Sequence, residues 1–217
     1  MSPRRLLLAG GLALSAFPAA AAAAAPPASV STPESCYSPR DPVDFAGAGF
    51  RPGARFAATI SGRQVASGRA TPFGDVSGSF RAPAPTPAGP GERTFTLRVS
   101  DGQRVGTTGF RSTVFGAGFS PSSGDPATLR VRFFAYDFGP GVTVYLHYLR
   151  PDLTLRATVT LGRTRGPCGT LVSARRRLFP FLARPGNWRL QFDTSRVYQR
   201  LARPRVRLVV PILRARR

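Results

Sequence analysis

The alternation of apolar and polar residues along the chain predicts short β-strands throughout. Apolar side chains occupy every second position at Phe56, Ala58 and Ile60, and again from Val142 to Tyr148. A period of two is typical of strands that bury one face. The 22 prolines and 23 glycines are spread along the chain, so few windows remain for a helix of about ten residues. The sequence therefore predicts an all-β fold.

One turn precedes two of these runs and indicates an internal repeat. Phe50-Arg51-Pro52-Gly53 returns as Phe138-Gly139-Pro140-Gly141. In such a turn proline sets φ at the second position, and glycine takes the positive φ required at the third. A Pro-Gly pair follows each copy, at 90–91 and 185–186, and precedes another alternating run. A competing alignment, of 47–50 with 116–119, extends over fewer residues. We therefore interpret the chain as two copies of one β module.

The turn signals also predict the domain organisation. Turns spaced by roughly eight to twelve residues are typical of a β-sandwich, and the chain is long enough for two immunoglobulin-like sandwiches in tandem. We expect a flexible leader over 26–40, the first sandwich over 41–115, a linker over 116–126 and the second sandwich over 127–217. The expected strands cover 43–50, 54–61, 63–70, 77–82, 92–100, 103–114, 127–136, 142–149, 153–161, 169–179, 187–193 and 205–213. A short helix is expected between Thr194 and Arg203, because Thr194 or Ser195 supplies an N-cap.

Residues 1–25 have the composition of a cleaved signal peptide. Arg4 and Arg5 precede an apolar run, and alanines between 19 and 25 offer small-residue cleavage sites. The paired arginines leave both the general and the twin-arginine export route open. The apolar run is shorter than the roughly 20 residues of a membrane anchor, and no later stretch is long and apolar enough to span a bilayer. We expect the mature chain to be secreted, extracellular or associated with the cell envelope, without a transmembrane segment.

The two cysteines, Cys36 and Cys168, are candidates for a disulfide, because an exported chain meets an oxidising environment. The bridge would join the edge of the first module to the middle of the second. Chain entropy predicts a stabilisation of about 4 to 5 kcal/mol from a loop of that length. Two separate buried thiols, or pairing with another molecule, are the alternatives.

Positive charge dominates the composition. The formal net charge is +21, and loss of Arg4 and Arg5 lowers it by two to +19. There is no lysine, and arginine has GC-rich codons like the abundant alanine, glycine and proline, so part of the excess of positive charge is explained by composition.

The candidate polyanion contacts are Arg175, Arg176, Arg177, Arg203, Arg205 and Arg207. Guanidinium groups match carboxylates and phosphates bidentately, although a solvated, edge-protecting face uses arginine equally well. The expected partners are an anionic cell-wall polymer or glycan, or other envelope proteins, without specific binding of nucleic acid.

Residues with catalytic or metal-binding chemistry are sparse. His147 is the only histidine, the ten carboxylates are scattered, and no Gly-x-Ser-x-Gly motif occurs. One histidine and two distant cysteines do not make a zinc site. We therefore predict a non-enzymatic protein without metal or cofactor. The alternative is an enzyme or a carbohydrate-recognition module with a stacking surface of Tyr145, His147 and Trp188.

Several motifs resemble those of a known group of proteins. Gly47 to Gly53, Asp75 to Phe80 and Thr94 to Leu97 resemble the bacterial immunoglobulin-like repeats, of the IPT/TIG-like kind, in secreted proteins of high-GC actinobacteria. In the second module, Leu146-His147-Tyr148, Gly166 to Gly169 and Pro185 to Asp193 resemble the C-terminal part of uncharacterised exported proteins of the same bacteria. The resemblance implies a sandwich fold and export, and it carries no catalytic residue.

Overall fold

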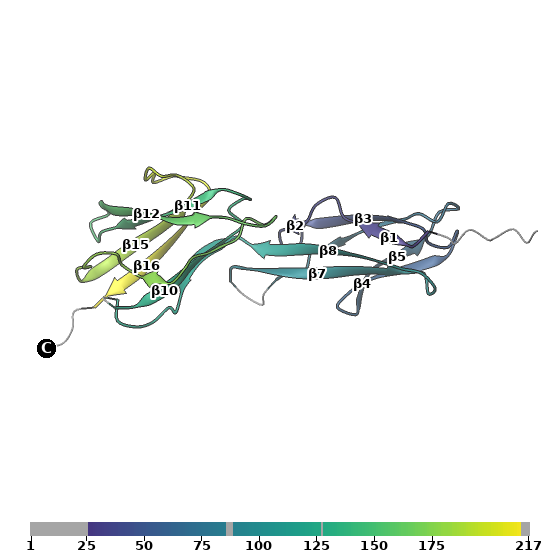
Figure 1. The fold of residues 1–217 in the computed structure, drawn as a ribbon, viewed down its shortest axis with the longest axis horizontal. Helices are drawn as coiled ribbons and strands as arrows, with labels where there is room; N and C mark the ends of the chain where they lie inside the picture. Colours follow the sequence, from purple (N-terminus) through teal and green to yellow (C-terminus); the bar gives the residue numbers. More distant parts are fainter. Residues whose placement is uncertain (1–25, 86–88, 127, 214–217) are drawn as a thin grey trace, which may run out of the picture.

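The computed structural model describes residues 26–85, 89–126 and 128–213, and this part of the chain is built of strands and loops (Figure 1). The described residues contain no helix, and hence none that could cross a membrane. The all-β prediction is confirmed. The predicted signal peptide and the arginines at 214, 216 and 217 lie outside the described residues.

The strands fall into two units that lie end to end (Figure 1). The first unit, residues 26–115, contains β1 (Ser29–Ser31), β2 (Cys36–Tyr37), β3 (Pro42–Ala48), β4 (Arg55–Ile60), β5 (Arg63–Arg69), β6 (Val76–Arg81), β7 (Gly91–Ser100) and β8 (Val105–Val114). The second unit, residues 116–213, contains β9 (Gly116–Ser120), β10 (Arg130–Tyr136), β11 (Thr143–Leu149), β12 (Leu155–Arg163), β13 (Leu171–Val172), β14 (Arg176–Arg177), β15 (Gly186–Asp193) and β16 (Arg205–Ile212).

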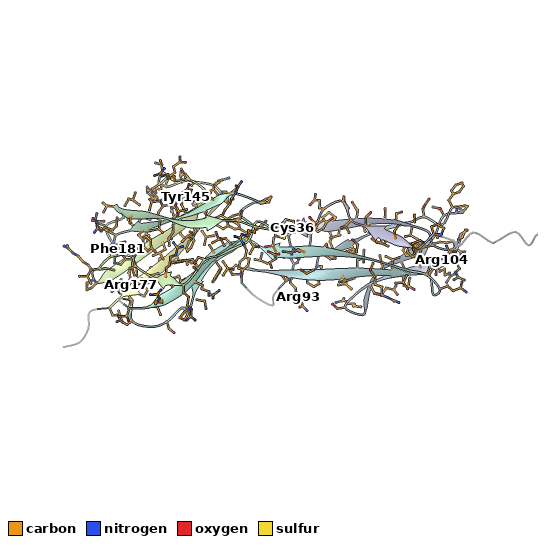
Figure 2. All side chains as sticks on the ribbon, in the orientation of Figure 1. Cys36, Arg93, Arg104, Tyr145, Arg177 and Phe181 are labelled. Carbon is orange, nitrogen blue, oxygen red and sulfur yellow. A yellow bond between two sulfur atoms is a disulfide. The ribbon has the colours of Figure 1, made fainter. Side chains whose placement is uncertain are left out.

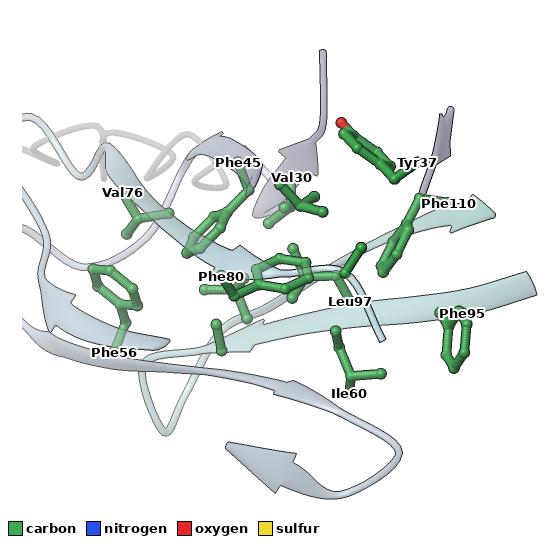
Figure 3. Packing of buried hydrophobic residues seen from close by; sticks show 14 of the residues in the cluster. Val30, Tyr37, Phe45, Phe56, Ile60, Val76, Phe80, Phe95, Leu97 and Phe110 are labelled. Carbon is green, nitrogen blue, oxygen red and sulfur yellow. The ribbon is translucent and has the colours of Figure 1, made fainter. Parts of the chain in front are cut away.

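Each unit buries its alternating apolar residues between two sheets. In the first, a sheet of order β1-β3-β6 faces a sheet of order β2-β8-β7-β4-β5. Phe45 from one sheet and Phe56 from the other meet edge to face (Figure 3). Val43 and Leu97 in the same core have no exposed surface. Full burial of one such side chain contributes roughly 1.5–3 kcal/mol, so this layer is the main source of stability.

The second unit repeats this arrangement in seven strands, with β2 and β14 as the strands that have no counterpart. Its sheets have the orders β9-β10-β13, with β14 also paired to β10, and β12-β11-β15-β16. The first corresponds to β1-β3-β6, and the second, reversed, to β8-β7-β4-β5. Its separate core contains Phe133, Leu146 and Phe192. The two units therefore share a strand order, while their interpretation as immunoglobulin-like domains stays a prediction.

The repeated turn occupies the same place in both copies. It precedes β4 in the first unit and β11 in the second, and the glycines have positive φ, 66° at Gly53 and 69° at Gly141. The amide of Ala54 donates to the carbonyl of Arg51 over 3.1 Å and closes the first turn. The competing alignment is not followed, because residues 116–119 lie in β9, the counterpart of β1.

Two segments predicted to lack regular structure form strands. The expected leader contains β1, which pairs antiparallel with β3, and β2, which pairs parallel with β8. The expected linker begins with β9, which pairs with β10 and is separated from β8 by Phe115 alone. These strands are too short to show an alternation. β1 and β9 pack on the cores through the buried side chains of Val30 and Ala117 respectively. The predictions of a flexible leader over 26–40 and of a linker over 116–126 are therefore wrong where these segments form β1, β2 and β9.

Two further expectations fail in the second unit. The expected strand over 169–179 is divided into β13 and β14, because Ser173 turns its amide and hydroxyl to the backbone of Phe133. The expected helix over 194–203 is not formed. Instead the amide of Ser195 binds the carboxylate of Asp193 over 2.9 Å, so the cap residue is used to hold a loop against the sheet.

The two units are joined covalently at their junction. Cys36 of β2 and Cys168 form a disulfide with a Cα–Cα distance of 5.3 Å, which confirms the predicted pairing (Figure 2). Beside it, the Glu92 carboxylate accepts hydrogen bonds from Arg111 and from the hydroxyl of Thr170 in the second unit. The rings of Phe115 and Phe138 stack 5.1 Å apart across the same junction. Polar and apolar contacts therefore support the covalent link.

Candidate anion-binding face

The outer face of the four-stranded sheet β12-β11-β15-β16 carries the second unit's polar side chains in cross-strand rows. Strand pairing places His147 beside Gln191 and Gln191 beside Arg207. The neighbouring rows are Leu149 with Arg189, and Tyr145 with Asp193 and Arg205. Because side chains alternate between the faces of a strand, all of these project away from the core.

A buried hydrogen-bond network lies at the centre of this face. His147 has no exposed surface, and its Nε2 lies 3.1 Å from both the Asp193 carboxylate and the Ser195 carbonyl. Both partners are acceptors, so Nε2 carries the proton. Nδ1, on the other side of the ring, lies 2.8 Å from the hydroxyl of Thr158. Gln191 donates to Asp193 over 2.7 Å and completes the buried part.

The loop over 194–204 covers this network. Its carbonyl at Gln199 accepts from Gln191 over 2.8 Å, and the ring of Tyr198 packs edge-on against His147 at 5.6 Å. Arg205 and Arg207 both donate to the carbonyl of Arg200, and Arg207 also donates to Gln191 over 2.8 Å. Two of the predicted polyanion contacts therefore fasten the loop with part of their guanidinium groups. Arg203 is exposed and lies in the loop, outside β16.

The predicted stacking surface of Tyr145, His147 and Trp188 is not formed. Tyr145 and His147 share the outer face, but His147 is covered by the loop. Trp188 points to the opposite face, where it packs on Phe179 and Phe181 in the core and donates its indole N–H to the carbonyl of Arg184. Trp188 and Gln191 are an odd number of residues apart in β15, and side chains alternate between the two faces of a strand. Trp188 therefore points to the core when Gln191 points outward.

The predicted contacts Arg175, Arg176 and Arg177 lie in and next to β14, which pairs with β10 in the facing sheet, and they approach the edge strand β12. Arg176 donates to the carbonyl of Thr160 in β12, and the carbonyl of Arg175 accepts from Arg130. Burial raises the pKa of the nearby Tyr148 phenol above its usual range, and the Arg176 guanidinium partly opposes this shift. β12 and β16 are the two edges of the same sheet, so the two arginine groups are separated and do not form one continuous row.

Positive charge is concentrated in the second unit. Residues 116–217 contain nineteen arginines and four carboxylates, a formal net charge of +15, whereas residues 26–115 contain ten arginines and six carboxylates, or +4. In the first unit Arg51 pairs with Asp101 and Arg111 with Glu92. In the second unit, the carboxylate of Asp193 is bonded to His147 and Gln191 in the buried network. The positive field is therefore strongest around the second unit.

A hollow of about 240 Å³ opens beside the loop on this face. It is lined by Leu149, Leu153, Arg189, Tyr198, Arg200 and Arg207. Within the described part of the chain, the guanidinium groups of Arg189 and Arg200 have no hydrogen-bond or ion-pair partner, and both residues are exposed. The lining thus offers donors and positive charge above an apolar base.

Of this lining, only Arg207 was among the predicted site residues. Arg189 alternates with Leu190 in a strand, and Arg200 lies in a stretch predicted to be helical, so neither differs in pattern from an ordinary surface arginine. The signal available in the sequence was the unequal division of arginines between the two modules, ten in residues 26–115 and nineteen in residues 116–217. It identifies the second unit but cannot identify the hollow, which depends on how the loop folds back.

Comparisons with known proteins give no family. No protein-family model and no curated protein matches the chain. Among solved structures, the chain is similar to the crystal structure of a tetra-tandem repeat in the extending region of a large adhesion protein. The similarity covers 84% of this chain and 47% of that one, with 15% identity and a TM-score of 0.30. The chain thus spans about half the length of that structure.

Proposed function

We propose that this chain is an exported, non-enzymatic protein of two immunoglobulin-like domains, and that its second domain binds anionic polymers of the cell envelope or extracellular space. The observation that carries the proposal is the formal net charge of residues 116–217, +15 against +4 for residues 26–115. A net charge of this size attracts polyanions at long range, and arginine pairs well with their carboxylates and phosphates.

Two features support the other parts of the proposal. A disulfide such as Cys36–Cys168 is typical of proteins in oxidising compartments outside the cytoplasm. Each unit packs three strands against a sheet that contains the other four strands of the repeat, an arrangement that agrees with an immunoglobulin-like sandwich. His147, the one histidine, is occupied in holding the loop, which agrees with a binding protein rather than an enzyme.

The test is retention of the mature chain on isolated cell walls at increasing salt. Polyanion binding through arginine predicts a steep loss of retention as ionic strength rises, because exposed charges are screened. Replacement of exposed Arg132, Arg165 and Arg196 by Gln should weaken retention. The matched replacement of Arg55, Arg63 and Arg98, exposed in the first unit, should have a smaller effect. Salt-insensitive retention, or equal effects of the two triple variants, would contradict the proposal.

A second candidate function, hydrolysis with a threonine nucleophile, is favoured by one row of contacts. The hydroxyl of Thr158 is hydrogen-bonded to Nδ1 of His147, and Nε2 of the same ring is hydrogen-bonded to Asp193, which places the three groups in the order of nucleophile, base and orienting acid. A fluorophosphonate probe distinguishes this function from binding alone. An adduct on Thr158, found by mass spectrometry and abolished by His147→Gln, would support hydrolysis. Absence of the adduct would leave the row as a structural anchor of the loop.

A further inference from the structure

We propose that the hollow beside the 194–204 loop is a subsite for a single phosphate group of a polyol-phosphate or sugar-phosphate polymer. The inference rests on the proposed function and specifies where and what the second unit binds. Three arginines, Arg189, Arg200 and Arg207, line the same hollow of about 240 Å³.

The three arginines come from different elements and are held differently. Arg189 projects from β15, in the cross-strand row of Leu149, and Arg200 projects from the loop. Arg207 is fixed in place, because it donates to Gln191 and to the carbonyl of Arg200. These two bonds leave most of its N–H donors unused. One positioned guanidinium and two unpaired ones therefore surround the same space.

Such a set of donors favours phosphate over carboxylate. A carboxylate has two oxygens and is matched by one guanidinium fork, whereas the oxygens of a phosphate accept bonds from several directions. Three positive charges facing a single carboxylate would remain largely uncompensated. A phosphate that carries more than one negative charge, or that is followed by further phosphates along a polymer, offsets more of the repulsion among the arginines.

The rest of the lining suits the unit to which the phosphate is attached. Leu149 and Leu153 form an apolar base, and Tyr198 presents a ring whose position is set by contact with His147. A water molecule occupies roughly 30 Å³ in the liquid, so the hollow has room for a phosphate and a small polyol or sugar fragment. An aromatic ring with an apolar base packs well against the C–H groups of such a fragment.

The experiment is a titration of the mature chain with sn-glycerol 1-phosphate, followed by amide NMR signals. The expected result is a set of saturable shifts confined to the neighbourhood of Leu153, Tyr198 and Arg200. Glucuronate, a carboxylate of similar size, should produce weaker shifts. Arg189→Gln with Arg200→Gln should weaken glycerol phosphate binding roughly tenfold or more, since charge-assisted hydrogen bonds are lost. The matched pair Arg63→Gln with Arg98→Gln should leave the affinity unchanged.

Three outcomes would overturn the subsite: shifts scattered over the whole second unit, equal responses to glucuronate and glycerol phosphate, or equal affinity in the two double variants. A further arm compares soluble poly(glycerol phosphate) with vesicles containing phosphatidylglycerol. Tighter binding to the polymer supports the proposal, and tighter binding to the vesicles overturns it in favour of a membrane surface. Salt-sensitive retention on cell walls without a glycerol phosphate response would contradict only the subsite. A glycerol phosphate response without wall retention would contradict the proposed function.

Discussion

At the scale of single residues, Asp101 connects the repeated turn of the first unit to the β7–β8 hairpin. Its buried carboxylate accepts hydrogen bonds from the amides of Arg51, Gln103 and Arg104, at 2.8, 2.9 and 2.7 Å. We expect Asp101→Ala to lower the free energy of unfolding by about 3 kcal/mol, because several buried donors lose their acceptor at once. Urea denaturation measures the change. Asp75→Ala, at an exposed carboxylate of the same unit, is the control and should change stability by about 0.5 kcal/mol or less.

The same carboxylate predicts a loss of stability in acid. Burial alone would raise the pKa of Asp101, but hydrogen bonds from Arg104, Arg51 and Gln103, together with the Arg51 charge, hold it at about 2, below its ordinary value of 3.8. A lowered pKa in the folded state means that the stabilisation is present above the unfolded value and is lost as pH falls from about 4 to about 2. Urea denaturation across this range should show the decline. Asp101→Asn should have a shallower decline, and an equally steep one would contradict this assignment.

At the scale of elements, the repeated turns should lose stability when their last glycine is replaced by a residue with a side chain. Gly53 and Gly141 have positive φ, and a Cβ at Gly53 would meet nothing within 4 Å. The cost of Gly53→Ala is therefore conformational, about 1 kcal/mol. Gly109→Ala is a matched control, because this strand glycine lacks a positive φ and its nearest neighbour would be 3.9 Å away. Thermal denaturation should show a loss for the first variant and no loss for the control.

The long strands and the turn could be predicted from the sequence because their information is local. β4, β7, β11 and β15 each show an alternation of six residues or more, and all four were predicted with ends within one or two residues of those observed. β1, β2 and β9 could not be found in this way. Each is five residues long or shorter, and its conformation is decided by pairing with another strand and not by its own pattern.

The candidate site shows the same division between local and distant information. The inward and outward faces of β16 follow from its alternation, which places Val206, Leu208 and Val210 on the face opposite Arg205 and Arg207, and these three residues pack in or against the core. The role of Arg205 and Arg207 does not follow, because their acceptor, the carbonyl of Arg200, belongs to a loop predicted as a helix. A loop that uses Asp193 and Gln191 as its partners has no signature in its own sequence.

At the scale of the whole molecule, the junction contains one unfavourable pair of like charges. Burial raises the pKa of the Asp137 carboxyl, and the negative charge of Asp41 in the other unit adds to the effect. A raised folded pKa means that stability is highest when the group is protonated and falls as pH rises through that pKa. Asp137→Asn should therefore stabilise the chain at neutral pH by about 0.5 kcal/mol. Asparagine also accepts the positive φ of 63° at this position. Thermal denaturation at pH 7 and pH 3 checks the sign, and the benefit should shrink in acid.

The disulfide should make the two units unfold as a more cooperative whole. It joins residues 132 positions apart, and in the chain-entropy model a closed loop of that length stabilises the folded state by about 5 kcal/mol. The Glu92–Thr170 bond and the Phe115–Phe138 stack lie beside it, so the bridge restrains surfaces that are already in contact.

Cys36→Ser with Cys168→Ser removes the covalent restraint and leaves these contacts in place. Urea denaturation of this variant should show a lower midpoint, and a first-unit transition separate from the second. Dithiothreitol should lower the midpoint of the parent chain and leave the variant unchanged. Coincident transitions at the same midpoint with and without the bridge would mean that the non-covalent contacts alone couple the units.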